Sequence, residues 1–285
     1  MNRAGLATLA LILAPLAGAD AHPGIGIVMD HRGNVFYTDL AQVWMIAPDG
    51  SRTVAVAGVH THELNLDEEG NLYGEHLWYE GDATGQWGHR VWRRSPDGRL
   101  SDILPATRGF RTDYSFVRDS QGAMYWAQRD SITTIRRRGA EGRISTVTSG
   151  GLRDVRWMTA APDGTLYLID LSDLKRISAD GRVTTLATGL GARRWSARLV
   201  DERHLLMGLT VDRTGNAFVA AYGDGTVKRV APDGSVTVVA KAHTPWAPSG
   251  VMVAPDGTLW VLETSLVNAV RVRHFRADGK IEVWG

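Results

Sequence analysis

A pair of glycine-containing turns recurs six times along this chain of 285 residues, and this repetition constrains the fold more than any other feature. The first turns end in Gly33, Gly70, Gly122, Gly164, Gly215 and Gly257. The second turns, such as Ala-Pro-Asp-Gly and Ser-Pro-Asp-Gly, end in Gly50, Gly98, Gly142, Gly181, Gly234 and Gly279. Proline fixes φ early in a turn, aspartate caps the turn and glycine takes the positive φ that other residues resist. Each pair therefore predicts two hairpins.

Short runs rich in β-branched and aromatic residues separate these turns, for example residues 34–38, 164–170 and 258–263. Successive first turns lie about 40 to 50 residues apart, which is the length of one four-stranded propeller blade. We therefore predict an all-β chain, a six-bladed β-propeller with four antiparallel strands per blade and hardly any helix. An open β-sandwich would not explain six matching turn pairs. Residues 251–284 hold four strands of their own, so the ring should close without a strand from the N-terminus.

The first residues have the pattern of a secretory signal peptide, with Arg3, an apolar stretch over residues 6–17 and then small residues. The apolar stretch is too short to span a bilayer. Ala-x-Ala cleavage motifs end at Ala19 and Ala21, so the mature chain should begin at Asp20 or His22. We expect residues 1–21 to be the signal peptide, residues 22–285 to be one domain, and the protein to be periplasmic or secreted without a membrane span after cleavage. A retained N-terminal anchor is the alternative.

Composition excludes several classes of function. The 32 Lys and Arg residues nearly balance the 31 Asp and Glu residues, so the charge does not favour binding to nucleic acid. The chain has no cysteine, which excludes disulfides, thiolate metal sites and a cysteine nucleophile. With 44% hydrophobic residues it can bury a core of its own, and we expect a monomer.

The repeated strand and Pro-Asp-Gly pattern resembles NHL-repeat propellers and the related regucalcin and gluconolactonase propellers over essentially the whole mature chain. The resemblance implies the fold, and a ligand-binding channel mouth on the face that carries the B-to-C loops. The lactonases place metal-binding Glu, Asn and Asp residues at stretches that here read 24–26, 155–157 and 206–208, and none of these keeps a ligand. This argues against a calcium-dependent lactonase of that design. Propeller lyases that resemble the peptide-amidating and streptogramin-cleaving enzymes use His-rich channel sites instead.

The second blade carries the largest irregularity, an aromatic and glycine-rich insertion between Leu77 and His89. A long aromatic loop on a regular scaffold is typical of a lid or a binding wall, although it can also be an insertion packed over a neighbouring blade. The aromatic residues that we expect to contact a ligand are Trp78, Tyr79, Trp87, Trp157 and Trp246.

The densest group of metal-ligand side chains also belongs to blade 2. His60 and His62 precede its first strand, and residues two apart in an extended strand point to the same side. Glu75 and His76 end its second strand on the same face of the ring. Imidazole and carboxylate suit one divalent metal such as zinc or copper, with His60, His62 and His76 as ligands. Ordinary polar residues of the channel rim are the alternative.

Two classes of function follow. In the first, the channel face binds a small molecule or another ligand, and a metal-assisted hydrolase or lyase acts there through Glu75, with Arg156 and Tyr114 steadying developing negative charge. In the second, the propeller is a non-catalytic module that binds an exported protein or a glycan. Pockets with a few convergent polar groups serve both, so the sequence leaves the question of catalysis open.

Overall fold

The computed structural model contains six four-stranded sheets, each built from consecutive strands, and describes residues 23–81, 83–84, 87–108, 117–194 and 200–285. Blades 1 to 3 comprise β1 (Ile27–Met29), β2 (Val35–Thr38), β3 (Gln42–Ile46), β4 (Arg52–Ala57), β5 (Leu64–Leu66), β6 (Leu72–Tyr79), β7 (Trp87–Arg94), β8 (Leu100–Arg108), β9 (Val117–Arg118), β10 (Met124–Arg129), β11 (Thr133–Arg138) and β12 (Ile144–Ser149). Blades 4 to 6 comprise β13 (Val155–Ala160), β14 (Leu166–Asp170), β15 (Asp173–Ile177), β16 (Val183–Ala187), β17 (Leu209–Val211), β18 (Ala217–Ala221), β19 (Thr226–Val230), β20 (Val236–Lys241), β21 (Trp246–Val253), β22 (Leu259–Ser265), β23 (Val270–Phe275) and β24 (Ile281–Trp284). Within the described residues one short 3-10 helix is present, η2 (Glu202–His204), and no helix is long and apolar enough to cross a membrane.

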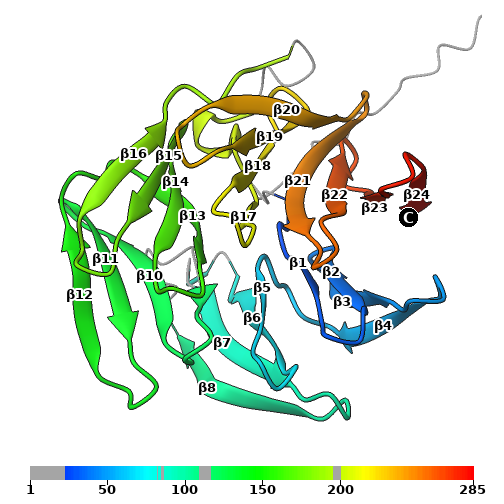
Figure 1. Cartoon of the computed structure of the whole chain (residues 1–285). Helices are drawn as coiled ribbons and strands as arrows, with labels where there is room; N and C mark the ends of the chain where they lie inside the picture. Colours follow the sequence, from blue (N-terminus) through cyan, green and yellow to red (C-terminus); the bar gives the residue numbers. More distant parts are fainter. Residues whose placement is uncertain (1–22, 82, 85–86, 109–116, 195–199) are drawn as a thin grey trace, which may run out of the picture.

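The blades stand side by side around a central axis, with the first strand of each nearest the axis (Figure 1). All twelve turn glycines adopt positive φ, between 78° and 89°. The aspartates work as the sequence predicts, since Asp30 Oδ1 accepts hydrogen bonds from the backbone N–H groups of Arg32 and Asn34. The prediction of a six-bladed propeller with four antiparallel strands per blade is confirmed.

The cores lie between neighbouring blades, where the faces of two sheets meet. Leu72 and Trp92 of blade 2 pack against Phe36 and Val43 of blade 1. The opposite face of the blade 2 sheet carries Tyr73, which packs against blade 3. A residue on strand β6 therefore faces either blade 1 or blade 3, depending on its parity.

The ring closes by packing blade 6 on blade 1, as expected. Strand β1 pairs with β2 of its own blade, and β24 is the outer strand of blade 6. The indole Nε1–H of Trp284 donates to the Gly50 carbonyl at 3.0 Å, and its ring stacks with that of Trp260. Strand β21 begins at Trp246, earlier than the expected start at Val251.

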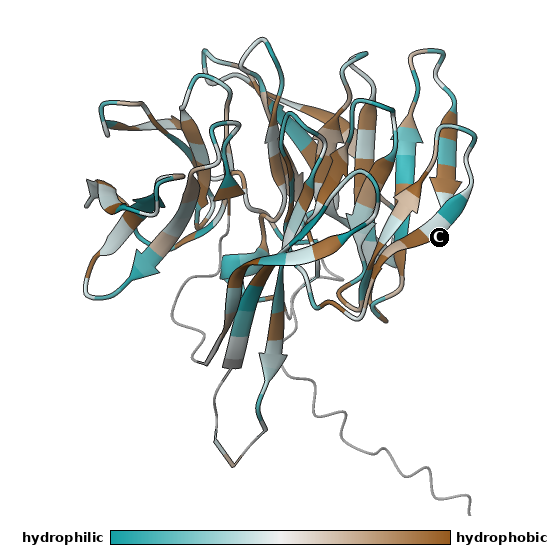
Figure 2. Cartoon of the chain, turned by 90° about the horizontal axis from the view of Figure 1, so that it is seen from below, coloured by the Kyte–Doolittle hydropathy of each residue, from teal (hydrophilic) through white to brown (hydrophobic). Residues whose placement is uncertain are grey.

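The blade 2 insertion is a hairpin and not the long loop suggested by its glycines. Strands β6 and β7 pair from Leu72 opposite Arg94 as far as Tyr79 opposite Trp87. Gly88 allows this pairing because the Trp78 indole lies over it, 1.8 Å from where a Cβ would be. Seen from the side, a hairpin of the blade nearest the viewer projects beyond one face of the ring (Figure 2).

Candidate functional site

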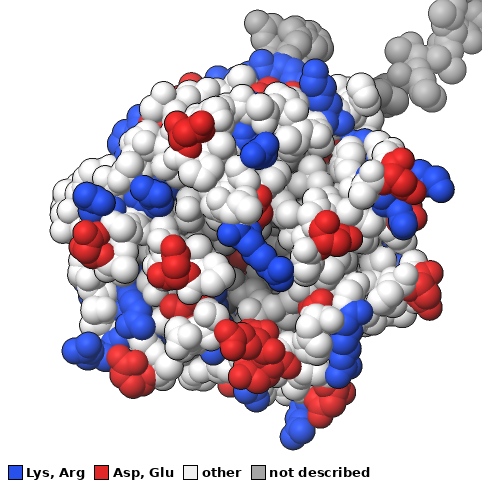
Figure 3. All heavy atoms as spheres, viewed as in Figure 1, with Lys and Arg blue, Asp and Glu red and all other residues white. Residues whose placement is uncertain are grey.

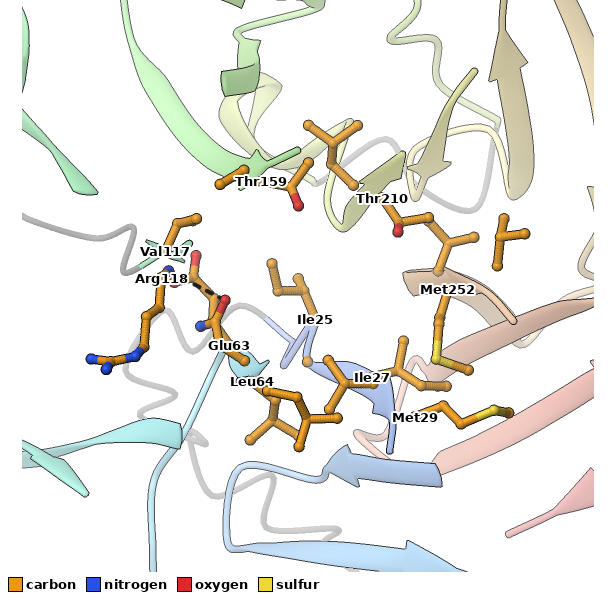
Figure 4. A pocket seen from close by; sticks show the side chains of 18 of the residues that line it. Ile25, Ile27, Met29, Glu63, Leu64, Val117, Arg118, Thr159, Thr210 and Met252 are labelled. Atoms are coloured by element: carbon orange, nitrogen blue, oxygen red, sulfur yellow. Dashed lines mark hydrogen bonds between the residues drawn. The ribbon is translucent and has the colours of Figure 1, made fainter. Parts of the chain in front are cut away.

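The central channel contains a cavity with a volume of about 350 Å³, lined by the inner strands of the blades. Figure 3 shows the hollow at the centre of one face of the ring, and Figure 4 shows the side chains around the cavity. Most of them are apolar, such as Ile27, Leu64 and Met252, and Glu63 is a carboxylate among them. His60 and His62 do not line this cavity. They lie beside it, in the connection that leads from blade 1 into blade 2.

Glu75 is the centre of a buried polar group in blade 2. Its carboxylate Oε1 lies 3.5 Å from His62 Nδ1, and its Oε2 lies 3.8 Å from His89 Nε2. The rings of His60 and His62 meet edge to face with centroids 4.8 Å apart. Glu75 is 2% exposed and His62 is 6% exposed, whereas the His89 side chain is 26% exposed. The structure therefore brings His60, His62 and Glu75 together and adds His89, whose side chain is partly exposed.

The sequence pattern places His89 at the end of the aromatic insertion, so His89 is not among the predicted site residues. In the β6–β7 ladder Glu75 stands opposite Val91, and His89 lies two residues away on the same face of the sheet. The register of the β6–β7 hairpin is the feature that identifies His89 as a neighbour of Glu75. His204 is a further residue near this group. It belongs to the long connection between blades 4 and 5 and lowers the pKa of His62 through its charge.

His76 faces away from Glu75, because adjacent residues of a strand point to opposite faces of the sheet. Its Nδ1 accepts a hydrogen bond from the His60 backbone N–H at 2.9 Å, and its ring stacks on Trp78. Strand β6 thus places His76 on the blade 1 side, where it holds the His60 backbone. Of the two residues expected to complete the site, the structure places Glu75 with the His60 and His62 side chains and places His76 against the His60 backbone.

Thr61 and Trp92 fix the backbone of this group. The Thr61 hydroxyl donates to the Glu75 carbonyl, and the Trp92 indole N–H donates to the same carbonyl at 2.9 Å. The Thr61 carbonyl accepts from the Thr38 hydroxyl at 2.7 Å, which ties the connection to blade 1. Glu75 and His62 therefore sit on backbone that three hydrogen bonds hold in place.

Burial sets the protonation of the group. Desolvation raises the pKa of Glu75 to about 7, against the smaller opposing effects of the His89 charge and the His62 backbone N–H. Desolvation lowers the pKa of His62 to about 3, with His60 and His204 adding to the shift. It also lowers the pKa values of His60 and His89, although Glu75 opposes this. Near neutral pH the imidazoles are neutral and the carboxyl holds its proton for part of the time.

The internal repeat shows that the scaffold does not require a carboxylate at position 75. The corresponding residue of each other blade, five positions after the first-turn glycine, is uncharged and at most 1% exposed. These residues are Thr38, Ala127, Ile169, Ala220 and Leu262. Five blades fill the position with apolar or hydroxyl side chains, so Glu75 carries a desolvation cost that the fold does not need. Residues whose pKa is strongly shifted by burial are common at functional sites.

The remaining predicted residues are dispersed. Trp157 is 1% exposed and belongs to the core between blades 4 and 5. The Arg271 Cζ atom lies over the Trp246 ring, 4.2 Å from the centroid of that ring. Tyr79 is 45% exposed on the blade 2 hairpin. Arg156 lies in β13 of blade 4, and its Nη2 donates to Asp154 Oδ2 at 2.9 Å.

Two predicted residues are not described at the level of their side chains. Tyr114 lies outside the described residues. Trp87 begins β7, and its side chain is likewise outside what the structure describes.

Comparison with known proteins identifies the fold. No protein-family model and no curated protein matches the chain. Among solved structures, it resembles virginiamycin B lyase from Staphylococcus aureus with 14% identity and a TM-score of 0.56, covering 92% of this chain and 84% of that one. It resembles the calcium-binding protein regucalcin from Agrobacterium tumefaciens with 18% identity and a TM-score of 0.55, covering 84% and 81%. It resembles an auxiliary nutrient binding protein from Bacteroides thetaiotaomicron with 10% identity and a TM-score of 0.63, covering 92% and 69%. At these identities the likeness shows the fold alone.

A calcium site of the lactonase design does not fit this chain. Calcium takes six to eight oxygen ligands, whereas the residues at the three lactonase ligand positions include Ile25, Arg156 and Met207, which supply no oxygen from their side chains. Within the described part of the chain, no three His, Asp or Glu residues are grouped so that they could hold a metal ion.

Proposed function

We propose that the protein is an exported propeller that binds a small molecule at the blade 2 site and acts on it as a hydrolase or lyase, with His89 as general base and Glu75 positioning it. The observation that carries the proposal is the carboxyl of Glu75 at a position that the other blades fill with uncharged residues. A neutral imidazole that is partly exposed can take a proton from a ligand or from water. The carboxylate beside it then stabilises the imidazolium.

Each member of the group has a distinct part in this chemistry. His89 combines contact with Glu75 and partial exposure to solvent, so we assign it as the residue that reaches the ligand. His62 is buried and neutral. Its Nδ1 lies 3.5 Å from Glu75 Oε1, the carboxylate oxygen that does not face His89, and this contact limits rotation of the Glu75 side chain. Because desolvation lowers the pKa of His89, this base is neutral near pH 7. The activity should fall as the pH drops through about 7, where Glu75 takes up a proton and no longer stabilises the imidazolium.

Ring opening of lactones is the reaction with which to test the proposal, since the fold is shared with a lyase that acts on virginiamycin B. We expect the wild-type protein to open at least one member of a panel of sugar lactones and streptogramin B lactones, followed by loss of the lactone carbonyl absorbance. His89→Ala should lower kcat/KM by about 100-fold or more, because general base catalysis contributes that much.

His31→Ala, in an exposed turn of blade 1, is the matched control and should retain the rate of the wild type. Failure of every lactone to react, together with saturable binding of one of them, would support the non-catalytic reading. In that reading the exposed Tyr79 and its neighbour Trp78 form an aromatic surface for a glycan or an exported protein.

Export is the second part of the proposal, and the leader pattern of residues 1–21 supports it. Intact-mass measurement of the protein recovered from the periplasm or the medium should give a chain that starts at Asp20 or His22. A protein that stays in the cytoplasm and begins at Met1 would contradict it.

A further inference from the structure

A second charged cluster lies where blade 3, the neighbour of blade 2, meets blade 4. Arg156 Nη2 donates to Asp154 Oδ2 at 2.9 Å, and Arg129 Nη1 lies 3.6 Å from Asp154 Oδ1. Arg129 also donates to the Val155 carbonyl at 2.7 Å. Both arginine side chains are 12% exposed and Asp154 is 22% exposed. The two guanidinium groups therefore share one carboxylate. All three side chains are mostly buried and keep a small solvent-exposed area.

The hydrogen bonding of the backbone places this cluster at the same level of the ring as the blade 2 site. Leu171 N donates to the Asp154 carbonyl, and Leu77 N donates to the His60 carbonyl in the same way. Arg156 in blade 4 therefore corresponds to His62 in blade 2. It is also a bulge residue, since Val155 pairs with Asp170 and Trp157 pairs with Ile169. Bulges redirect side chains and are common beside active sites.

The other blades show that the scaffold does not require these charges. The residues that correspond to Arg156 in the other described lead-in segments are His62, Ile25, Met207 and Ser249. The residues that correspond to Arg129 are Leu40, Leu77, Leu171, Tyr222 and Thr264. Arginine thus replaces uncharged side chains at two adjoining positions, as glutamate does at position 75.

The pair of arginines carries a net positive charge. Lys175 and Arg153 are held by the buried Asp170 and by Asp173 next to the cluster. Arg153 and Lys175 are balanced by these two carboxylates, whereas Arg129 and Arg156 share the one carboxylate of Asp154, which leaves one positive charge on the pair. A fork of guanidinium donors with excess positive charge matches the paired oxygens of a carboxylate or a phosphate group.

We propose that Arg129 and Arg156 form an oxyanion subsite that binds the carboxylate or phosphate group of a small-molecule ligand. Blades 2 and 4 are separated by one blade, so a ligand held by its anionic group at this subsite can reach across the mouth of the channel toward His89. The assignment of that ligand as the substrate rests on the proposed function, but the subsite itself does not.

The test is a titration of the purified protein, followed through the Nε–H signals of its arginines by NMR, with succinate in one arm and inorganic phosphate in the other at constant ionic strength. Saturable shifts of two signals are expected with at least one anion. One signal should be missing from Arg156→Gln and the other from Arg129→Gln. Each substitution should weaken binding by about tenfold or more, since a hydrogen bond to a charged group is lost. Saturable shifts with succinate indicate a carboxylate site, and saturable shifts with phosphate indicate a phosphate site.

Arg153→Gln is the matched control, because Arg153 lies on the same segment, is 52% exposed and pairs with Asp173 rather than with Asp154. It should bind the anion as the wild type does. If Arg129→Gln does not fold, Arg156→Lys keeps the charge but loses the fork and should weaken binding by a smaller factor. Shifts that rise linearly without saturation, or equal loss in Arg153→Gln, would overturn the subsite. His89→Ala should bind the anion normally, so failure of the catalytic proposal leaves this result intact.

Discussion

Replacing Glu75 with glutamine is expected to stabilise the folded protein above pH 7 while it removes the proposed activity. A pKa of about 7 in place of the ordinary 4.5 means that the folded protein favours the protonated carboxyl. The stability that this provides is complete below pH 4.5 and is lost as the pH rises through about 7. Glutamine keeps the shape without the charge. At pH 9 we therefore expect Glu75→Gln to raise the free energy of unfolding by roughly 3 kcal/mol, with little difference from the wild type at pH 4.5.

Urea unfolding at several pH values measures this effect. The variant must be compared with the wild type at each pH, because the buried histidines make the protein less stable as the pH falls, whereas Glu75 makes it less stable as the pH rises. The pKa of His62 is lowered to about 3, so its contribution is lost as the pH falls below 6.5. Glu141→Gln, on an exposed turn with a side chain 59% exposed, should change the stability by less than about 1 kcal/mol at any pH. A Glu75→Gln protein that is less stable than the wild type at pH 9 would mean that Glu75 is an ionised structural residue.

Removal of the Asp170 charge should have the largest destabilising effect. Asp170 is fully buried and accepts hydrogen bonds from Lys175 Nζ at 2.6 Å and from the backbone N–H groups of Arg153 and Asp154. Asp170→Asn leaves the Lys175 ammonium, whose side chain is 10% exposed, without its carboxylate. Breaking a buried ion pair from one side costs about 3 to 5 kcal/mol. Urea unfolding at pH 7 should show a loss of this size.

The double variant Asp170→Asn/Lys175→Met separates the ion pair from other effects. It removes both charges and should recover a large part of the lost stability, because no buried charge remains unpaired. Lys280→Met is the matched control, since Lys280 faces Asp278 with a side chain 79% exposed, and should change the stability by less than about 1 kcal/mol. Losses that simply add in the double variant would show that the two residues do not act as a pair.

The sequence predicted the scaffold well because the repeat is local. Each turn is specified by a few neighbouring residues, and Gly33 or Gly50 needs no distant partner to adopt positive φ. The candidate site depends on register and parity, which a single strand does not reveal. His76 was grouped with Glu75 although adjacent residues face opposite sides, and His89 was assigned to a loop that is in fact paired strand.

Contacts between distant segments were beyond the sequence as well. Nothing local shows that Arg129 of blade 3 reaches the Val155 carbonyl of blade 4. Nor does a local pattern show that His204, in a long connection between later blades, lies close enough to lower the pKa of His62. The repeat became informative for function only when corresponding positions were compared, since Glu75 then stands out from five uncharged residues.

The most direct test of the proposed site is the titration of the Glu75 carboxyl itself. Carbon-13 NMR of the glutamate side-chain carboxyls, with Glu75→Gln to identify the signal, follows its protonation from pH 3 to pH 9. A midpoint near 7 is the predicted result, because the carboxyl is buried between neutral imidazoles. A midpoint near 4.5, the ordinary value for glutamate, would contradict the account, since Glu75 would then be an ordinary ionised carboxylate.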